Sequence, residues 1–463
     1  MASAITAPTY DPIPTAQALA DKATGAAKAA LKLQTDAAKA AATALGSLNS
    51  AISAFQTALD NLTGTGKSLL AQSAALSDTT FGSASASGRG VAGTYDFFVE
   101  QLATAGQTKY SNLQSSTGNS GKLHVAMGNG SGFDVDLVKA AGDGTLTIRE
   151  LAAAINNADG NGGKVAASVV TFGTNTQLVL TSNATGAATG ISLDLSNMGA
   201  SDLKTALSNS ANVAANTPQD AMVWVGGKAG TKVTQASNTF TNIDGLSVTF
   251  TKAQAATDAN LTVTVKTDNS GTAANAKAFV DAYNKLKSTI DGLMAPVTVV
   301  EDGVTKLVAG PLGNDAGIKS LQTRLVDLLR PGSGLTLAAF GITSQRDGTL
   351  ALDNARLSKQ LALTPDGLDR LLGSTAVNGA SGIATSLDKY LDKWSGVNGQ
   401  IDQRQDDNKK LQDKLAQRQD DIDARWDAAY NRYVLQFTRL QTLQGQMNHN
   451  SSLFDALFSS DKS

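Results

Sequence analysis

The sequence predicts an α+β protein of several domains, in which long helices at both ends of the chain enclose a helical layer and a β-rich head. Three observations predict this fold class. An apolar stripe of helical spacing runs from about Ile401 to Met447, and a second one runs through the alanine-rich segment from Thr15 to Leu62. Residues 81–271 instead form short alternating segments separated by glycine, asparagine and aspartate, which is typical of strands and turns.

The C-terminal stripe predicts one long helix. Its steps of three and four residues, with one step of seven, average close to the helical period, and Arg418 is its only polar member. At about 1.5 Å per residue the helix would be about 70 Å long, too long for the core of a compact domain. Its other faces are charged, so we expect it to bury the stripe against another helix. The stripe comprises Leu411, Leu415, Ile422, Trp426, Ala429, Tyr433, Phe437, Leu440, Leu443 and Met447.

The N-terminal segment predicts the partner helix. Pro8, Pro12 and Pro14 indicate an extended or disordered start, and Thr15 is the expected N-cap. Alanines replace large residues in the first half, so this half should be weak alone. At about 65 Å, the helix matches the C-terminal one in length, and we expect the two to lie side by side. The second half carries a heptad seam of Leu45, Leu48, Ile52, Phe55, Leu59 and Leu62.

The middle of the chain predicts a β-rich head interrupted by one amphipathic helix from Ile148 to Asn157. Charged residues are sparse there, and glycine, serine, threonine and asparagine are frequent, as in an extracellular head with a polar but weakly charged surface. The clearest strand patterns are Tyr95–Val99, Phe133–Leu137, Val165–Phe172, Leu178–Thr181, Ile191–Leu195, Met222–Val225, Leu246–Phe250 and Leu261–Val265.

From Thr272 the pattern returns to helix. Phe279, Tyr283, Leu286, Ile290 and Leu293 step by four and three. We expect a hairpin at Val297–Val308 and two short strands around the Asp347-Gly348 turn. The expected N-caps are Asp315, Asp353 and Thr364, the last with Pro365 as first helical residue.

This layout divides the chain into four nested domains. The helical leg combines residues 1–45 with 400–463, and the inner helical domain combines 46–80 with 272–399. The two β-rich head domains would be residues 81–120 with 216–271, and residues 121–215 inserted within them.

The bulk composition excludes several partners. With 38 basic and 40 acidic residues, the net charge of −2 gives no basic excess for nucleic acid or an anionic membrane. No run of about 18 apolar residues occurs, so we expect no membrane insertion. The chain has no cysteine and therefore no disulfide or thiolate metal site. Its first residues lack the pattern of a cleaved signal, so export would need another route.

Two segments resemble binding loops. Gly64-Thr-Gly66-Lys67-Ser68 is similar to the end of a phosphate-binding loop, but the first glycine of that motif is replaced by Asn61 and a helix precedes it. A flexible helix end is the alternative. The segment from Asn157 to Gly162 is similar to the start of a calcium loop, but Ser168 stands where a bidentate glutamate is needed. The alternatives are a plain turn and weak, opportunistic calcium binding.

The other candidate groups favour no chemistry. His124 and His449 lie far apart in the chain without metal-ligand neighbours, and both are expected at the surface. The pairs Asp406-Asp407 and Asp420-Asp421 have basic neighbours and are typical of a solvated helix face. We therefore predict no catalytic residues, no cofactor, no metal site and no enzymatic activity.

Several segments resemble the flagellar hook-associated protein 2 family, the filament caps of bacteria. Their order and spacing carry the resemblance from about residue 45 onward, whereas Tyr10–Pro14 (YDPIP) replaces the usual Gly-Ser-Gly-Leu-Asp-like start. The matching segments are Ala92–Ala103 (AGTYDFFVEQLA), Leu151–Ala158 (LAAAINNA), Val165–Val170 (VAASVV), Ala278–Asn284 (AFVDAYN), Phe340–Ile342 (FGI), Asp347–Leu350 (DGTL), Arg432–Leu440 (RYVLQFTRL) and Gln446–Asn448 (QMN).

The resemblance implies a secreted protein at the distal tip of the flagellar filament. It implies a homo-oligomeric ring, a pentamer or similar, that helps exported flagellin to fold and insert. Other implied partners are the hook-filament junction proteins and the flagellar export apparatus with its chaperone. The expected assembly residues are those of the two helix stripes: Leu45, Leu48, Ile52, Phe55, Leu59, Leu411, Leu415, Ile422, Trp426, Tyr433, Phe437, Leu440 and Met447.

Two other interpretations remain open from sequence. One is an adhesin whose polar head binds host glycan or mucin. The other is a different axial flagellar protein, either flagellin or a junction protein, although the helical layer between the head and the last helix argues against it.

Overall fold

The structure, a computed structural model, describes residues 11–142, 144–173, 175–301, 304–330, 334–373 and 382–459. Across these residues, no helix combines the length and the apolar character needed to cross a membrane. The chain divides into two compact units. The first comprises Met1–Thr65, Ala276–Leu361 and Gly367–Ser463, and the second comprises Gly66–Asn275 with Ala362–Asp366.

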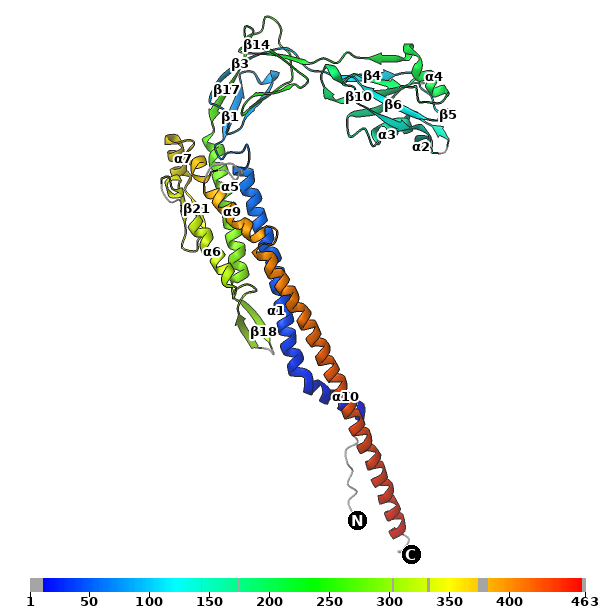
Figure 1. The fold of residues 1–463 in the computed structure, drawn as a ribbon, viewed down its shortest axis with the longest axis vertical. Coiled ribbons are helices and arrows are strands. Elements are labelled where there is room, and N and C mark those ends of the chain that lie inside the picture. Colours follow the sequence, from blue (N-terminus) through cyan, green and yellow to red (C-terminus); the bar gives the residue numbers. More distant parts are fainter. Residues whose placement is uncertain are drawn as a thin grey trace. The chain divides into compact units, whose positions relative to one another are not determined.

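The first unit is organised around the two long helices α1 (Pro12–Thr63) and α10 (Gln400–Ser459). They lie side by side, as the blue and orange ribbons of Figure 1 show. The pairing is antiparallel, because Asn408 meets Ala38 whereas Trp426 meets Asp21. The expected pairing of the two chain ends is therefore confirmed.

The start of α1 differs from expectation. The helix begins at Pro12, not after Thr15, and its N-cap is Asp11, whose side chain accepts a hydrogen bond from the Ile13 amide at 3.1 Å. The first-turn amides of a helix have no intrahelical partner, so Pro12 and Pro14 lose nothing there. The expectation of a non-helical chain up to residue 14 is wrong for residues 12–14, and Pro8 lies outside the described residues.

A helical layer packs on the upper part of these helices. Asp315 and Asp353 cap α6 and α7 as expected, each accepting hydrogen bonds from two backbone amides, and both short hairpins form. The last expected start is displaced, since α8 begins at Gly367, two residues after Pro365. The elements are α5 (Asn269–Met294), β18 (Val297–Glu301), β19 (Val304–Val308), α6 (Ala316–Leu328), η4 (Leu337–Phe340), β20 (Ile342–Ser344), β21 (Leu350–Leu352), α7 (Asn354–Leu363), α8 (Gly367–Leu372) and α9 (Ile383–Ser395).

The second unit contains an antiparallel eight-stranded sheet over one apolar core. Phe97 lies at the centre of this core, with its ring 5.4 Å from that of Phe240 and 5.8 Å from that of Phe250. In spatial order the strands are β14 (Thr231–Gln235), β13 (Ala221–Val225), β3 (Gly93–Gln101), β17 (Leu261–Thr267), β1 (Gln72–Leu76), β2 (Gly82–Ala86), β16 (Leu246–Phe250) and β15 (Thr239–Ile243), with η1 (Thr79–Phe81) before β2.

A second core in this unit lies among smaller sheets and short helices. Helix α3 (Ile148–Asn156) forms as expected, with a capping box between Thr147 and Glu150. One sheet contains β12 (Val213–Ala215), β4 (Ala105–Tyr110), β10 (Asn175–Thr185) and β9 (Val165–Phe172), and another contains β11 (Ile191–Asp194), β6 (Lys122–Met127) and β7 (Gly132–Asp136). The rest are β5 (Ser116–Thr117), β8 (Thr145–Leu146), α2 (Leu137–Ala141), α4 (Asp202–Ser208), η2 (Ala187–Thr189) and η3 (Ser210–Asn212).

The predicted fold class is confirmed, and each strand pattern identified in the sequence corresponds to a strand. The chain enters the large sheet at Gln72, however, before the expected head boundary at residue 81. Strands β1 and β2 are rich in alanine, serine and glycine, so they carry no β-branched signal and are held by pairing with their neighbours. The division into four domains stays a prediction.

Candidate assembly surface

The second half of α1 is buried within the first unit. Leu45, Leu48, Ile52, Phe55 and Leu59 are each 3% exposed or less. The Phe55 ring lies 6.5 Å from that of Phe279 and 6.3 Å from that of Tyr283, both on α5. The next residue is Gln56, whose side chain bridges to α9, donating to Asp388 at 3.0 Å and accepting from Ser395 at 2.8 Å. The heptad seam of the sequence thus packs against the inner helical layer.

The start of α10 is fastened to this layer by Arg404. Its Nε and Nη2 atoms donate to the two carboxylate oxygens of Asp315, at 2.7 and 3.1 Å, and its guanidinium lies 5.0 Å from the centre of the Trp394 ring. The arginine is the main reason that the pKa of Asp315 is lowered, and the backbone amides of α6 add to the effect. A two-point ion pair of this kind fixes direction as well as position.

Below this fastening, α10 packs on the alanine-rich half of α1. Leu415 and Ile422 on α10 form a small apolar cluster with Leu31 and Ala38 on α1. The alanines along α1 let the helices approach closely but remove little apolar area from water. This part of the seam is therefore narrow and thinly packed compared with the region around Phe55.

Polar contacts border the narrow seam. The Trp426 indole donates to Asp21 at 2.7 Å and stacks on Tyr430, with ring centres 5.2 Å apart. Lys28 pairs with Asp423 at 3.3 Å and also lies over the Trp426 ring. The pKa of Asp423 is lowered, first by a hydrogen bond from Gln419 and then by Lys28. Exposed pairs of this type contribute little each, so they direct the pairing more than they strengthen it.

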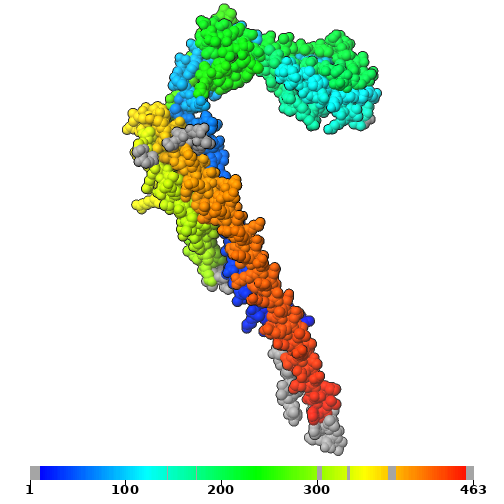
Figure 2. Space-filling model, in the orientation of Figure 1, coloured from blue at the N-terminus to red at the C-terminus, as the bar shows by residue number. Residues whose placement is uncertain are grey.

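The last part of the α10 stripe is largely uncovered. Tyr433 and Phe437 are half-buried, whereas Leu440, Leu443 and Met447 are 43%, 56% and 68% exposed. Figure 2 shows this part of α10, in red, continuing past the blue start of α1. Leu453 and Phe454 extend the exposed apolar residues further. We call residues 433–454 of α10 the distal stripe; it prolongs the seam that α1 covers above it.

The structure therefore distributes the sequence-predicted assembly residues over three environments. The α1 residues are buried in the first unit, and Leu415, Ile422 and Trp426 contribute to the seam with α1. Tyr433, Phe437, Leu440 and Met447 belong to the distal stripe. Leu411 is separate from all of them, because it is 46% exposed although it follows the periodic pattern. Their role in assembly stays a prediction.

Neither candidate binding loop has the setting that its motif requires. Helix α1 directly precedes Gly64-Thr-Gly66-Lys67-Ser68, where a phosphate loop requires a strand. In the calcium-like segment, the Asn161 side chain is buried and bonded to the backbone of Ile155, Asn156 and Val165. Its amide is therefore used to close the turn after α3.

The two histidines lie in different surroundings. His124 Nδ1 lies 2.7 Å from an oxygen of Asp134 on the neighbouring strand, and His449 is exposed on α10. Asp406, Asp407, Asp420 and Asp421 are all exposed on α10. Over the described ranges, no three histidine, aspartate or glutamate side chains are grouped to hold a metal ion.

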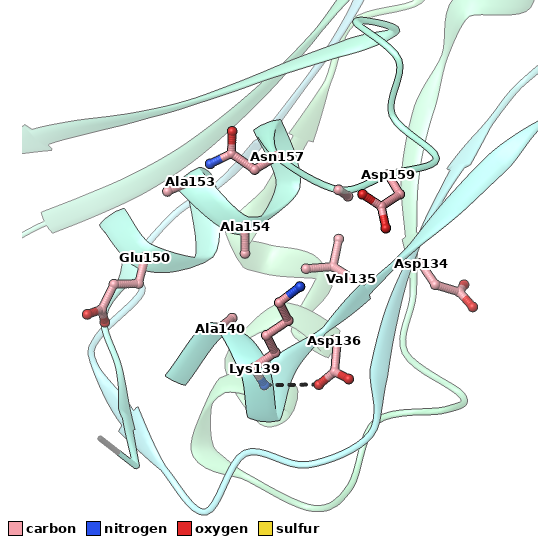
Figure 3. Close-up of a pocket in the computed structure, with 11 residues that line it drawn as sticks. Asp134, Val135, Asp136, Lys139, Ala140, Glu150, Ala153, Ala154, Asn157 and Asp159 are labelled. Carbon is pink, nitrogen blue, oxygen red and sulfur yellow. Dashed lines mark hydrogen bonds between the residues drawn. The ribbon is translucent and has the colours of Figure 1, made fainter. Parts of the chain in front are cut away.

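A hollow of about 370 Å³ in the second unit lies beside α2 and α3. Figure 3 shows its carboxylates spread around the rim instead of converging on one point. Asp134 pairs with His124, Asp136 caps α2, and Glu150 completes the capping box of α3. These groups already have structural partners, so the hollow gives no specific support to the adhesin interpretation.

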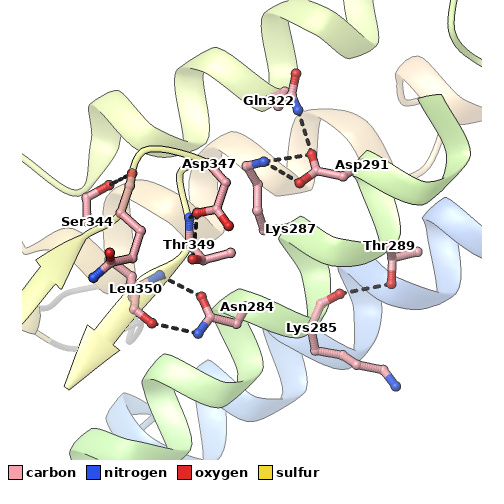
Figure 4. A network of polar contacts seen from close by, with 11 residues as sticks. Asn284, Lys285, Lys287, Thr289, Asp291, Gln322, Ser344, Asp347, Thr349 and Leu350 are labelled. Atoms are coloured by element: carbon pink, nitrogen blue, oxygen red, sulfur yellow. Dashed lines mark hydrogen bonds and ion pairs between the residues drawn. The ribbon is translucent and has the colours of Figure 1, made fainter. Parts of the chain in front are cut away.

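Sequence reasoning missed a buried polar cluster between α5 and α6. Lys287 is 3% exposed and binds Asp291, which also accepts from Gln322 at 2.5 Å (Figure 4). One turn away, Asn284 holds both the amide and the carbonyl of Leu350. The sequence signal is the i,i+4 pair of Lys287 and Asp291 on a helix that otherwise carries the apolar pattern of Tyr283, Leu286 and Ile290. The cluster ties the β20–β21 hairpin and α6 to α5.

The fold defines a class: a structural protein with long paired terminal helices, a helical layer and a β-sheet head. Comparison with known proteins identifies the family. The model of the flagellar hook-associated protein 2 C-terminus matches residues 218–449, and that of the N-terminus matches residues 16–106. The chain therefore belongs to the flagellar hook-associated protein 2 family, and its place is the bacterial flagellum, at the distal end of the filament and outside the cell.

Individual relatives agree with this assignment. The chain is 31% identical over 393 residues to the lateral flagellar hook-associated protein 2 of Vibrio parahaemolyticus, covering 82% of this chain and 85% of that one. It is 31% identical over 441 residues to the B-type flagellar hook-associated protein 2 of Pseudomonas aeruginosa, covering 90% and 89%. The crystal structure of the D1-D2-D3 domains of the Escherichia coli flagellar cap protein FliD matches 79% of this chain and 99% of that one, with a TM-score of 0.51 and 25% identity.

Proposed function

We propose that this protein caps the distal end of the flagellar filament as a homo-oligomeric ring and promotes the folding and insertion of exported flagellin. The observation that carries the proposal is the distal stripe of α10, an apolar surface that prolongs the α1–α10 seam and that the described residues of the single chain leave largely exposed. An exposed apolar surface of this kind marks a contact with another macromolecule. The role is structural, without a catalytic step.

The composition of the α1–α10 seam supports a helical leg that can leave one binding position on the filament and occupy another. Alanines line the α1 side of the contact, and its border relies on exposed pairs such as Lys28 with Asp423. Both features make the free energy of helix pairing small. By contrast, the Arg404–Asp315 pair and the packing around Phe55 hold the top of the leg firmly. A cap that advances with every added subunit needs this combination.

The same features suit export in an unfolded state. The chain has no cysteine, so no disulfide has to be reduced or re-formed on the way. The proposed partners are flagellin, the hook-filament junction proteins and the export apparatus with its chaperone. The proposed ring is a pentamer or similar, and contacts between its subunits add to those of the legs.

Complementation of a cap-deficient strain tests the proposal. The full chain should restore motility, and electron microscopy should show a plate at the filament tip. Without it, flagellin should accumulate in the medium as monomer. If the chain is exported at normal levels and filaments stay absent although the recipient's flagellin is the cognate one, the capping role is wrong.

A further inference from the structure

The β18–β19 hairpin exposes apolar side chains on both of its faces. Val297, Val299 and Val308 are 41%, 37% and 41% exposed, and Leu307 is 73% exposed. Leu307 pairs with Thr298 and therefore lies on the face opposite Val297 and Val299. Its described contacts are chiefly between its own two strands. An isolated two-stranded hairpin with apolar faces is only marginally stable in water, so it needs a cover.

The base of this hairpin is held in a fixed place. Leu312, just after β19, is buried, and its amide donates to the Leu293 carbonyl at 3.1 Å. Gly310 lies so close to the end of α5 that an added Cβ would be 2.2 Å from the Ala295 carbonyl oxygen. Figure 1 shows the hairpin projecting beyond the end of α5. The hairpin is therefore firmly attached at its base and has apolar side chains on both faces.

The same unit has an apolar groove between α1 and α5. Its volume is about 680 Å³, and it is lined by Gly46, Ala51, Ala54, Phe55, Ala282 and Lys285 among others. From residue 40 to residue 59, α1 carries no charged side chain. Along the helix the lining runs from Thr43 to Phe55, about 18 Å. A five-residue strand is about 17 Å long, so the groove and the hairpin match in length.

The hydroxyl groups of this groove need no polar partner. The hydroxyls of Thr43, Ser47 and Ser50 each donate to the carbonyl four residues back in α1. On the α5 wall the hydroxyl of Thr289 donates in the same way to Lys285. Because these hydroxyls are satisfied inside their own helices, an apolar occupant leaves none of them without a hydrogen bond. The groove therefore suits apolar side chains.

The size of the hairpin decides which occupant fits. Two five-residue strands offer only a few hundred Å² to a partner, below the roughly 800 Å² per side of a stable two-protein complex. Such a contact works where other contacts hold the same partner in place, as in a ring of identical subunits. A hairpin and a groove at different places on one unit also give a head-to-tail contact, and such contacts form a ring where the rotation between copies closes.

We propose that the β18–β19 hairpin of one copy inserts into the α1–α5 groove of the neighbouring copy. The proposal rests on the ring of the proposed function and names the surface through which that ring closes.

Cysteine cross-linking tests this pairing, because the chain has no cysteine of its own. Full-length Leu307→Cys and Ala54→Cys proteins are mixed and oxidised. We expect covalent dimers at a yield about tenfold above that of Leu307→Cys mixed with Ser53→Cys, since contact raises the effective concentration of the two thiols. Ser53 is the matched control: it is also exposed on α1 but does not line the groove.

Equal yields with Ala54→Cys and Ser53→Cys overturn the proposal, as does a product dominated by Leu307–Leu307 dimers. Disulfide formation of Leu307→Cys with added flagellin that carries an introduced cysteine, in preference to Ala54→Cys, would assign the hairpin to flagellin instead. Native mass measurement of the cysteine-free chain separates the two levels of inference. If oligomers form but the cross-link does not, the hairpin contact alone is wrong. If neither oligomers nor the cross-link form, the proposed ring is wrong as well.

A second measurement does not depend on thiols. Leu307→Lys should weaken oligomer formation about tenfold, because it places a second ammonium group in an apolar groove that Lys285 already lines. Val397→Lys is the control, as Val397 is 94% exposed in the same unit. Equal effects of the two variants on the oligomer's dissociation constant contradict the proposal.

Discussion

Arg404 at the start of α10 and Asp315 at the start of α6 form a two-point ion pair across 89 residues of the chain. The same carboxylate also accepts hydrogen bonds from the amides of Gly317 and Ile318. One side chain thus caps one helix and orients another. The direction in which the leg leaves the helical layer depends on this junction.

The pair makes the first unit sensitive to acid. The folded-state pKa of Asp315 is lowered, mainly by Arg404, so its stabilising contribution is complete above the unfolded pKa near 4 and is lost as the pH falls through the lower, folded value. Asp315→Asn should lower the free energy of unfolding by about 1–3 kcal/mol at pH 7 and by much less at pH 2. Urea unfolding at both pH values measures this. The exposed Asp406→Asn is the control, and an equal loss at both pH values would contradict the electrostatic explanation.

The buried side chain of Tyr283 should make the first unit less stable at alkaline pH. Its hydroxyl is buried without a hydrogen-bond partner among the described residues, and burial, with the charge of Asp291, raises its pKa to about 12. Its contribution is therefore complete below the unfolded pKa near 10 and is lost as the pH rises towards 12. Tyr283→Phe should be neutral or stabilise by about 1 kcal/mol at pH 7 and should reduce the alkaline loss. Thermal melts from pH 7 to pH 11 check this; a strong destabilisation at pH 7 would indicate an unrecognised partner of the hydroxyl.

The distal stripe should tolerate charge in the free chain but not in the assembled cap. Phe437→Asp or Leu440→Asp should leave the head folded and the protein exported, because this part of α10 is partly or largely exposed. Burying the carboxylate in a helix contact costs several kcal/mol, so cells should be non-motile and shed monomeric flagellin. Swimming assays and the flagellin content of the medium measure this. Gln436→Asp, next to Phe437 but exposed, is the control; full-length filaments on Phe437→Asp cells would remove the stripe from the proposed function.

If the phosphate-loop or calcium-loop alternative were right, substitutions in these loops would impair motility, and we expect that they do not. Lys67→Ala, His124→Ala and Asp159→Ala should swim normally at unchanged protein levels, because none of these residues has a catalytic role in the proposed function. A motility defect of Lys67→Ala alone would revive the phosphate-loop alternative, and nucleotide hydrolysis by purified protein would then be the next measurement.

We expect a fragment that contains the head to fold on its own only if it includes strand β1. It lies between β17 and β2 in the large sheet, so a fragment of residues 66–275 should fold and give a β-dominated circular dichroism spectrum. A fragment of residues 81–275 lacks this interior strand, leaves its neighbours unpaired and should melt at a lower temperature or not fold. Similar melting of both fragments would show that the sheet closes without β1.

The sequence by itself determined the elements whose signals are local. The stripe from Leu415 to Met447 and the pattern of Phe279, Tyr283 and Leu286 predict helices because every third or fourth residue of a helix faces the same side. Alternation at Val165–Phe172 likewise predicts a strand, and Asp315 and Asp353 are caps that act within their own first turn. The order of these segments also carried the family resemblance, which the comparisons confirmed.

Only the tertiary structure decided which faces meet. Periodicity identifies an apolar face but not its partner, so it did not separate Leu45–Leu59, buried within the first unit, from Leu440 and Met447, which the chain leaves exposed. It also missed β1 and β2, whose small residues become strands through the sheet beside them. The Arg404–Asp315 pair and the buried Lys287 cluster join residues far apart in the chain. Their geometry arises from packing, which no short stretch of sequence encodes.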